Sequence, residues 1–226
     1  MISFSHVKKS FGDKQVLLDV SFDVKDGEVF FIIGQSGVGK SVLIKHLVGL
    51  LYPDGGEIFL DGEEISRFDE EQMYPVRQKC AMVFQHSTLF DSMTCAENVA
   101  LPLRKHKSMK DAEALAEANR LLDMVRMREF GDRYPAELGD GMRKRVAIAR
   151  ALTLDPRYVL FDEPTTSLDP VAARRVDRLI RELADRIAFL YKGTLRKVGT
   201  PGEFRASDDP IVAQFTRGIA EGPMEV

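Results

Sequence analysis

The sequence predicts an α/β fold in which a sheet is flanked by helices and one strand leads into a phosphate-binding loop. Three observations predict it. Residues 34–41 fit the pattern G-x-x-x-x-G-K-[ST]. The apolar run 29–33 before them is typical of a central parallel strand covered on both faces. Residues 40–51 after them carry apolar side chains at helical spacing.

Each residue type in this loop has a chemical reason to be there. Glycines let backbone N–H groups curl around phosphate oxygens, and a helix N-terminus adds positive dipole. The Lys40 ammonium is expected to reach the β- and γ-phosphates, and the Ser41 hydroxyl to bind Mg²⁺. A Gly-rich turn before a core helix is the alternative. The predicted ATP-binding residues of the loop are Gly34, Gln35, Ser36, Gly37, Val38, Gly39, Lys40 and Ser41.

Composition excludes several classes of protein. The 226 residues are 44% hydrophobic and 30% charged, with a net charge of −3, so no general attraction to nucleic acid is expected. No apolar stretch approaches the length of a membrane span, and the start lacks the apolar region of a signal peptide. Cys80 and Cys95 are too few for a metal site and are expected to be buried. Any role at a membrane must therefore come through a partner.

The order of patterns predicts a core with a helical insertion. Residues 2–33 are expected to form β structure, with a hairpin turn at Asp26-Gly27. Residues 91–153 look mostly helical, with one amphipathic helix over 111–127 and another from Met142. The expected organisation is a single domain with a core of 1–90 and 154–226. Further predicted elements are strands at 58–60, 158–161, 187–191 and 195–198, a helix at 170–184, and a short helical tail from 201 with a loose end.

A second chemical signal follows the apolar strand 158–161, which ends in Asp162 and Glu163. An acid at a strand tip next to a phosphate loop can hold Mg²⁺, the role expected of Asp162. Glu163, one residue on, is expected to polarise an attacking water as general base. Two surface acids at a strand end are the alternative.

Several motifs in order give the chain a family resemblance over nearly its full length. Residues 158–163 match the second nucleotide motif of ATP-binding cassette (ABC) transporters, 166–169 match the D-loop, and 137–152 align with the signature loop and its helix. The chain therefore resembles the ATP-binding subunit of an ABC transporter. The resemblance implies a P-loop NTPase core, a mixed sheet flanked by helices, with an antiparallel β subdomain and a helical insertion subdomain.

The resemblance also implies further site residues. As the Q-loop residue, Gln85 would bind the metal and water. The catalytic residues would then be Gln85 and Glu163, and the Mg²⁺ ligands would be Ser41, Gln85 and Asp162. Phe11 would stack on adenine, with Val16 beside it; a core Phe at a strand edge is the alternative. The signature loop, acting on the nucleotide of a second copy, would be Leu138, Gly139, Asp140, Gly141 and Met142. The D-loop would contribute Ser167, Leu168 and Asp169.

Partners follow from the same resemblance. Two ATPase subunits would form a homodimer or pseudo-dimer that sandwiches Mg²⁺-ATP, and a groove near Gln85 would receive a helix of a transmembrane permease. Residues 84–94, 97–100 and 209–215 look most like Mla/Mce-type lipid-transport ATPases. They imply phospholipid or another lipid as substrate, with a lipid-binding Mce-type protein as a further candidate partner. The expected location is cytoplasmic, on the inner face of the cell membrane.

The signature loop departs from the family pattern. The family reads Leu-Ser-Gly-Gly followed by Gln or Met, whereas this chain reads Leu138-Gly139-Asp140-Gly141-Met142. The serine hydroxyl that the family uses to donate to the γ-phosphate is therefore absent. The Asp140 carboxylate stands at this site for an anion. Two unit charges 4 Å apart repel by about 1 kcal/mol in water and about 4 kcal/mol at an effective dielectric near 20. Asp140 is also expected to cap the helix that follows.

The family resemblance implies a switch histidine that contacts the γ-phosphate and follows a strand beyond the D-loop helix. This sequence has no histidine in that part of the chain. All four histidines, His6, His46, His86 and His106, precede Asp162. A strand of about 5–6 residues and a crossover of about a dozen or more are expected to be absent between Asp185 and Arg186. Their loss would expose the hydrogen-bonding groups of neighbouring strands. Two hypotheses follow: an ATPase subunit of a lipid transporter, or a hydrolysis-deficient nucleotide-binding and regulatory subunit.

Overall fold

The computed structural model describes residues 1–84, 87–162, 183–217, 219 and 221–224. Contacts group the chain into two compact units, Met1–Met73 with Thr165–Val226, and Tyr74–Pro164. Each unit is described by itself below. Some predicted features lie outside the described residues: Gln85, Glu163, Ser167, Leu168, Asp169 and nearly all of the helix expected at 170–184.

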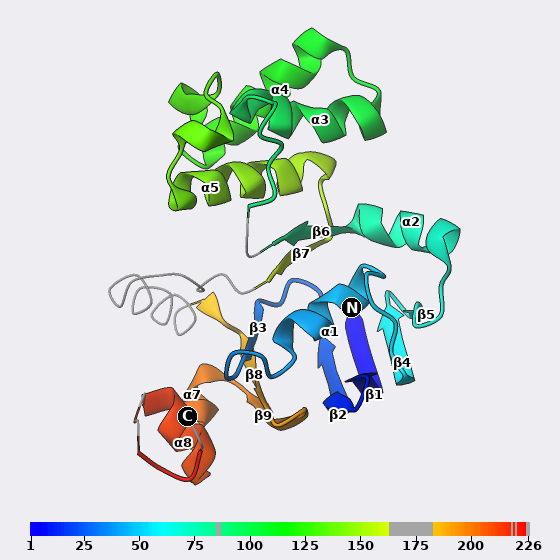
Figure 1. Cartoon of the computed structure of the whole chain (residues 1–226), viewed down its shortest axis with the longest axis vertical. Helices are drawn as coiled ribbons and strands as arrows, with labels where there is room; N and C mark the ends of the chain where they lie inside the picture. The colour runs from blue at the N-terminus through cyan, green and yellow to red at the C-terminus, as the bar shows by residue number, and fades with distance from the viewer. Residues whose placement is uncertain (85–86, 163–182, 218, 220, 225–226) are drawn as a thin grey trace. The chain divides into compact units, whose positions relative to one another are not determined.

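A mixed sheet forms the first unit, as the predicted fold class requires (Figure 1). Its strand order is β3-β8-β9-β2-β1-β4-β5. The β3–β8 and β9–β2 pairs are parallel, and the other pairs are antiparallel. The strands are β1 (Ile2–Phe11), β2 (Lys14–Val24), β3 (Phe30–Ile33), β4 (Gly55–Leu60), β5 (Glu63–Glu64), β8 (Arg186–Tyr191) and β9 (Thr194–Gly199).

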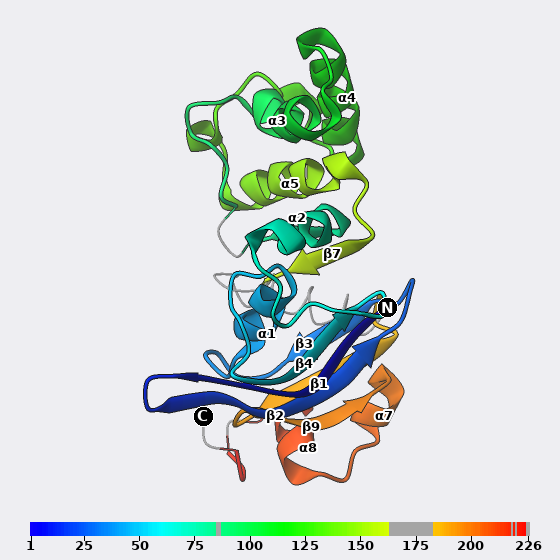
Figure 2. The same cartoon turned by 90° about the vertical axis from the view of Figure 1, so that its right-hand side faces the viewer.

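Helices cover both sides of the β3–β8 part of this sheet. α7 (Pro201–Arg205) and α8 (Pro210–Arg217) lie on one side, and α1 (Lys40–Leu47) lies on the other in both views (Figures 1 and 2). Alternate residues of β8 point toward α7 and α8, because successive side chains of a strand face opposite ways. The buried cluster on that side contains Ile187, Phe189, Tyr191, Phe204, Val212 and Met224.

Two expectations for the strand before the phosphate loop were wrong. The Asp26-Gly27 turn does not make a hairpin of β2 with β3, because β8 and β9 lie between them in the sheet. Among the described residues of the first unit, β3 is also not central. It is the last strand in the order, all four of its residues are only partly buried, and the preceding Val29 is 43% exposed. An apolar run reports the hydrophobicity of a strand and not the number of its neighbours.

The ends of two helical segments also differ from expectation. α1 ends at Leu47 rather than at residue 51, and Gly49 follows with a positive φ of 66°, a usual way to stop a helix. In the tail, the expected loose end is held at Met224. The buried Gln214 side chain donates from Nε2 to the Met224 carbonyl (3.1 Å) and accepts from the Met224 N–H (2.7 Å).

The second unit is built from helices on a short parallel strand pair. α5 (Asp140–Ala151) lies between the β6–β7 pair and the helices α3 and α4 (Figure 1). Its strands are β6 (Cys80–Val83) and β7 (Tyr158–Phe161), and its other helices are α2 (Glu70–Lys79, which begins in the first unit), α3 (Cys95–Lys107) and α4 (Asp111–Met124). Short 3₁₀ turns are η1 (Arg128–Phe130), η2 (Pro135–Glu137) and η3 (Leu152–Leu154).

Helix prediction succeeded where the apolar stripe was strong. The predicted amphipathic helix over 111–127 forms as α4, which ends at Met124 rather than at residue 127. Its buried face carries Ala114, Ala118, Leu121 and Leu122. α3 was not predicted individually, although Thr94 and Glu97 form a capping box at its start, a signal readable from sequence. Cys80 and Cys95 are both buried, as expected. Among the described residues, β7 pairs only with β6, and Val159 and Phe161 remain 36% and 40% exposed.

Candidate nucleotide-binding site

The phosphate-binding loop follows β3 directly and ends in α1, which is the strand–loop–helix arrangement expected for it. Gly39 is the N-cap of α1 with φ at 115°, and no side chain caps the helix. Gly34 and Gly37 also have positive φ, at 154° and 75°. Because the first N–H groups of a helix lack partners within it, the uncapped start of α1 can offer them to an anion.

Close contacts, with backbone at Gly34 and with side chains at Gly39, explain why glycine stands at these two positions of the loop. A Cβ on Gly34 would overlap the carbonyl oxygen of Leu190 in β8. A Cβ on Gly39 would lie 3.0 Å from side-chain carbons of Val16 and Leu17 in β2. The structure thus brings Val16, predicted beside the nucleotide, against the loop. The Leu190 contact was not predicted, because a backbone carbonyl carries no sequence signal.

The Lys40 ammonium turns back over the loop. Its Nζ donates to the carbonyls of Gly34 (3.0 Å) and Gln35 (2.7 Å). Ser41 is the second residue of α1 and is partly buried. Phe11 lies at the end of β1 with 46% of its surface exposed, and the Lys9 ammonium is 5.5 Å from its ring centroid. An exposed aromatic ring is available for stacking on a base, as expected of Phe11.

His46, on α1, is a buried titratable group just beyond the loop. It is 3% exposed, and Nδ1 lies 2.5 Å from the Val42 carbonyl oxygen. Burial lowers the pKa of His46 below its ordinary value, and the nearby Lys9 acts in the same direction. The folded protein therefore holds this imidazole in its neutral form at neutral pH.

We expect this burial to make the protein less stable in mild acid. The unfolded chain takes up a proton on His46 near pH 6.5, whereas the folded chain resists it. The free energy of unfolding should therefore fall as pH drops from about 7.5 to about 5.5. Urea unfolding across this range measures it. His46→Gln should flatten the curve, and an unchanged curve in this variant would contradict the assignment.

Asp162, in the second unit, has the surroundings expected of a metal ligand. It follows β7, its N–H donates to the Val83 carbonyl (3.0 Å), and it is 6% exposed. Its Oδ1 is buried with no hydrogen-bond partner among the described residues. A buried carboxylate oxygen without a partner is costly unless a cation compensates it. Asp162 therefore fits Mg²⁺, a cation that takes oxygen ligands.

The signature segment shows one clear difference from expectation. Asp140 is not the N-cap of α5. Gly139 occupies that position in extended conformation (φ −70°, ψ 160°), and Asp140 is the first helical residue. The Asp140 carboxylate instead pairs with the Arg143 guanidinium, which also donates to the Leu138 carbonyl (2.8 Å). Leu138 is buried in the helical core, whereas the Asp140 side chain is 93% exposed. The guanidinium of Arg143, whose pairing was not predicted, therefore lies beside the unusual carboxylate.

Comparison with known proteins decides the family. The family model described as ABC transporter matches residues 17–166, well over half of the chain. The chain belongs to the ABC transporter family. As an ABC transporter ATP-binding domain it is a member of a family of ATPases, as predicted, and its fold is the ABC cassette fold.

Three relatives illustrate the range of this family. The probable ribonucleotide transport ATP-binding protein mkl of Mycobacterium leprae is 35% identical over 99% of this chain and 70% of its own length. The Arabidopsis thaliana chloroplast protein TRIGALACTOSYLDIACYLGLYCEROL 3 is 35% identical over 99% of this chain and 75% of its own. A dimeric post-hydrolysis structure of the ATP-binding cassette MJ0796, bound to ADP and Pi, matches 89% of this chain and 99% of its own with a TM-score of 0.78 and 28% identity.

The alignment lengths bear on the missing segment. The mkl alignment spans 244 positions, whereas this chain has 226 residues. At least 18 positions of that alignment therefore lack a residue in this chain. This minimum is similar to the length of the strand and crossover expected to be absent near residues 185–186.

Proposed function

We propose that this ABC transporter ATP-binding subunit binds Mg²⁺-ATP at residues 34–41 and drives transport of phospholipid or another lipid. Three features support the nucleotide part of the proposal. They are the close contacts at Gly34 and Gly39, the Lys40 ammonium over the loop, and the uncapped start of α1. Phe11 and Val16 would contact the adenine end. The lipid part is supported by the Mla/Mce-like segments and by a relative named for a glycolipid, although another relative is named for ribonucleotide transport.

Mg²⁺ would be held by Ser41, Gln85 and Asp162, and when bound it would neutralise charge developing on the phosphates. Glu163 would hold the attacking water and accept its proton. The D-loop residues Ser167, Leu168 and Asp169 and the segment 138–142 would act at the interface of a dimer. The dimeric MJ0796 cassette with ADP and Pi supports this arrangement by analogy.

A permease would supply the membrane part. Among the described residues, no helix is long and apolar enough to cross a membrane. The second unit has a cavity of about 220 Å³ between the end of α2, β6, α3 and α5, next to the position of Gln85 in the chain. We assign this cavity to a helix of the permease, which would place the subunit peripherally on the inner face of the cell membrane. An Mce-type lipid-binding protein would complete the transporter.

A second function is favoured by two observations. The signature segment carries Asp140 in place of the family pattern, and at least 18 aligned positions are missing. The signature segment is expected to act on the γ-phosphate, and we propose that the missing positions include the segment with the switch histidine. The loop at 34–41 keeps its pattern. The second candidate is therefore a regulatory subunit that binds nucleotide without hydrolysing it.

Phosphate release separates the two candidates. The purified chain, alone and with its permease in lipid vesicles, is compared with Glu163→Gln, which lacks the general base. Turnover above this control supports the transport ATPase. Turnover equal to the control, together with Mg²⁺-ATP binding in calorimetry, supports the regulatory subunit. Absence of nucleotide binding would remove both.

A further inference from the structure

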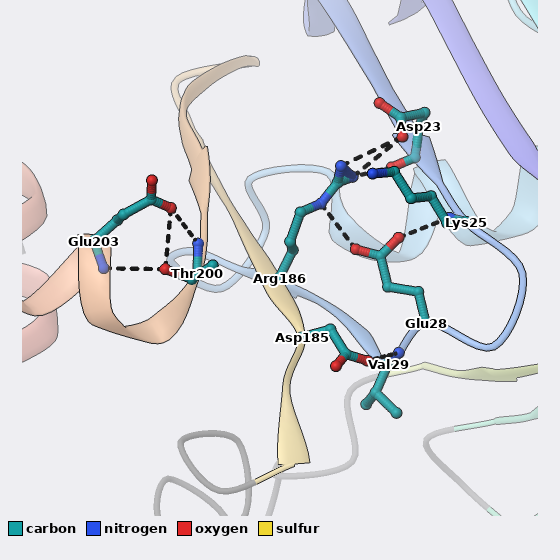
Figure 3. Close-up of polar contacts among 8 residues, drawn as sticks. All are labelled: Asp23, Lys25, Glu28, Val29, Asp185, Arg186, Thr200 and Glu203. Atoms are coloured by element: carbon teal, nitrogen blue, oxygen red, sulfur yellow. Dashed lines mark hydrogen bonds and ion pairs between the residues drawn. The ribbon is translucent and has the colours of Figure 1, made fainter.

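A buried ion pair fixes the start of β8. The Nε of Arg186 lies 2.8 Å from Oε1 of Glu28, and its guanidinium also donates to the Asp23 carbonyl (Figure 3). The Glu28 side chain is only 6% exposed, and its other oxygen accepts from the Lys25 N–H at 2.7 Å. The buried carboxylate thus has a partner on each side, and Arg186 supplies the only cation that the described contacts give it.

The neighbouring residue makes the same connection through the backbone. The Asp185 N–H donates to the Val29 carbonyl (3.0 Å), and the Asp185 carboxylate accepts from the Val29 N–H (2.8 Å). The Arg186 guanidinium also lies 5.3 Å from the ring centroid of Phe30. Two consecutive residues therefore fix the segment that leads into the phosphate loop. They set the register in which Phe30 pairs with Arg186.

This register determines what lies beside the loop at the far end of β8. Four residues after Arg186, the Leu190 carbonyl oxygen occupies the space that a Cβ on Gly34, the first residue of the loop, would need. Just after β8, the Gly193 carbonyl accepts from the Leu18 N–H at 2.9 Å. In β2, Leu18 directly follows Val16 and Leu17. Side-chain carbons of these two residues would lie 3.0 Å from a Cβ on Gly39, the last glycine of the loop. β8 thus supports both ends of the loop, directly at Gly34 and through β2 at Gly39.

We propose that Arg186 is a positioning residue for the phosphate loop. Through Glu28 and the register of β8, it holds Gly34 and Gly39 in the conformations that present backbone N–H groups to the β- and γ-phosphates. The inference rests on the proposed Mg²⁺-ATP site. It also accounts for a phosphate loop that keeps its shape despite the segment expected to be absent between Asp185 and Arg186, because the contacts that support the loop come from residues at and after that point.

The test removes the ion pair without leaving a buried charge. Glu28→Gln/Arg186→Met replaces both charges with neutral side chains of similar length, because one buried charge left alone would risk unfolding. Outer contacts that orient a binding group typically change affinity by about 10- to 100-fold. We expect the double variant to bind Mg²⁺-ATP at least about tenfold more weakly in calorimetry. Amide hydrogen exchange at residues 34–41 should become faster in nucleotide-free protein.

Thr200→Ala is the matched control. Thr200 and Glu203 form the capping box of α7 in the same unit and contact each other rather than the segment before the loop (Figure 3). Loss of this cap should lower the urea midpoint, since helix caps stabilise proteins. It should leave loop exchange and nucleotide affinity at wild-type values. Arg186→Lys, which keeps the charge without the planar fork, should recover part of the affinity.

The outcomes distinguish this inference from the proposed function. Wild-type exchange at residues 34–41 in the double variant would overturn the positioning role, whatever its stability. The same loss of protection in Thr200→Ala would also overturn it, because the effect would then be general destabilisation. If the wild-type chain binds no Mg²⁺-ATP and the double variant still loosens the loop, the proposed function fails and the positioning role stands.

Discussion

Gly34→Ala is expected to weaken Mg²⁺-ATP binding by about 100-fold or more, equivalent to about 2.7 kcal/mol. Gly34 has φ at 154°, a conformation that L side chains rarely adopt, and its added Cβ would overlap the Leu190 carbonyl oxygen. Because the obstacle is backbone, either the loop or β8 must move. Movement of the loop displaces the N–H groups that face the phosphates. Isothermal titration calorimetry with Mg²⁺-ATP measures the loss.

Gly62→Ala controls for the cost of a positive φ alone. Gly62 follows β4 with φ at 85°, and a Cβ there would meet nothing within 4 Å. This variant should lose about 1 kcal/mol of stability and keep wild-type affinity for Mg²⁺-ATP. Wild-type affinity in Gly34→Ala would show that the contact with β8 does not set the shape of the loop.

Repair of the signature segment alone is expected to leave ATP turnover at the level of Glu163→Gln. Gly139→Ser with Asp140→Gly restores the family pattern, yet at least 18 aligned positions stay absent. The resemblance places the switch histidine in the segment expected to be absent between Asp185 and Arg186. Insertion of the aligned mkl residues between Asp185 and Arg186, together with the two substitutions, should raise turnover by about 100-fold. Loss of one preorganised group at a transition state typically costs about that much in rate.

Matched variants show which part of the repair matters. The insertion alone should give intermediate turnover, because Asp140 still places a carboxylate in the signature segment. The fully repaired chain carrying Glu163→Gln should return to background, which ties any recovered phosphate release to this site. Ordinary family turnover from the two substitutions alone would show that the segment expected to be absent near residue 185 is dispensable.

Local signals predicted the parts of this protein that depend on neighbours in sequence. The phosphate loop is a run of eight residues between a strand and a helix, and the structure has that order. α4 was predicted because its apolar stripe repeats at helical spacing. The position of β3 could not be predicted in this way, because the identity of its partner, β8, depends on residues more than 150 positions away.

In the candidate site, too, features that depend on local sequence were predicted, and features that depend on distant strands were not. The residue types of the loop follow from phosphate chemistry, whereas its support by Leu190 and Arg186 depends on the register of a distant strand. Asp140 was expected to cap α5 because aspartate favours that position. Gly139 takes it instead, and the Arg143 guanidinium three residues along the helix pairs with the carboxylate. The roles assigned to Gln85, Glu163 and the D-loop stay predictions.

The edge position of β3 within the first unit has a consequence for its backbone groups. In a parallel ladder, alternate residues bond to one neighbour, so the residues between them present N–H and C=O groups to the other edge. In the described part of the chain, β3 has no strand on that edge, and all four of its side chains are apolar. Natural proteins protect such edges with charges, proline or bulges. Within the described part of the first unit, this edge is where backbone N–H and C=O groups remain available for pairing with a further strand.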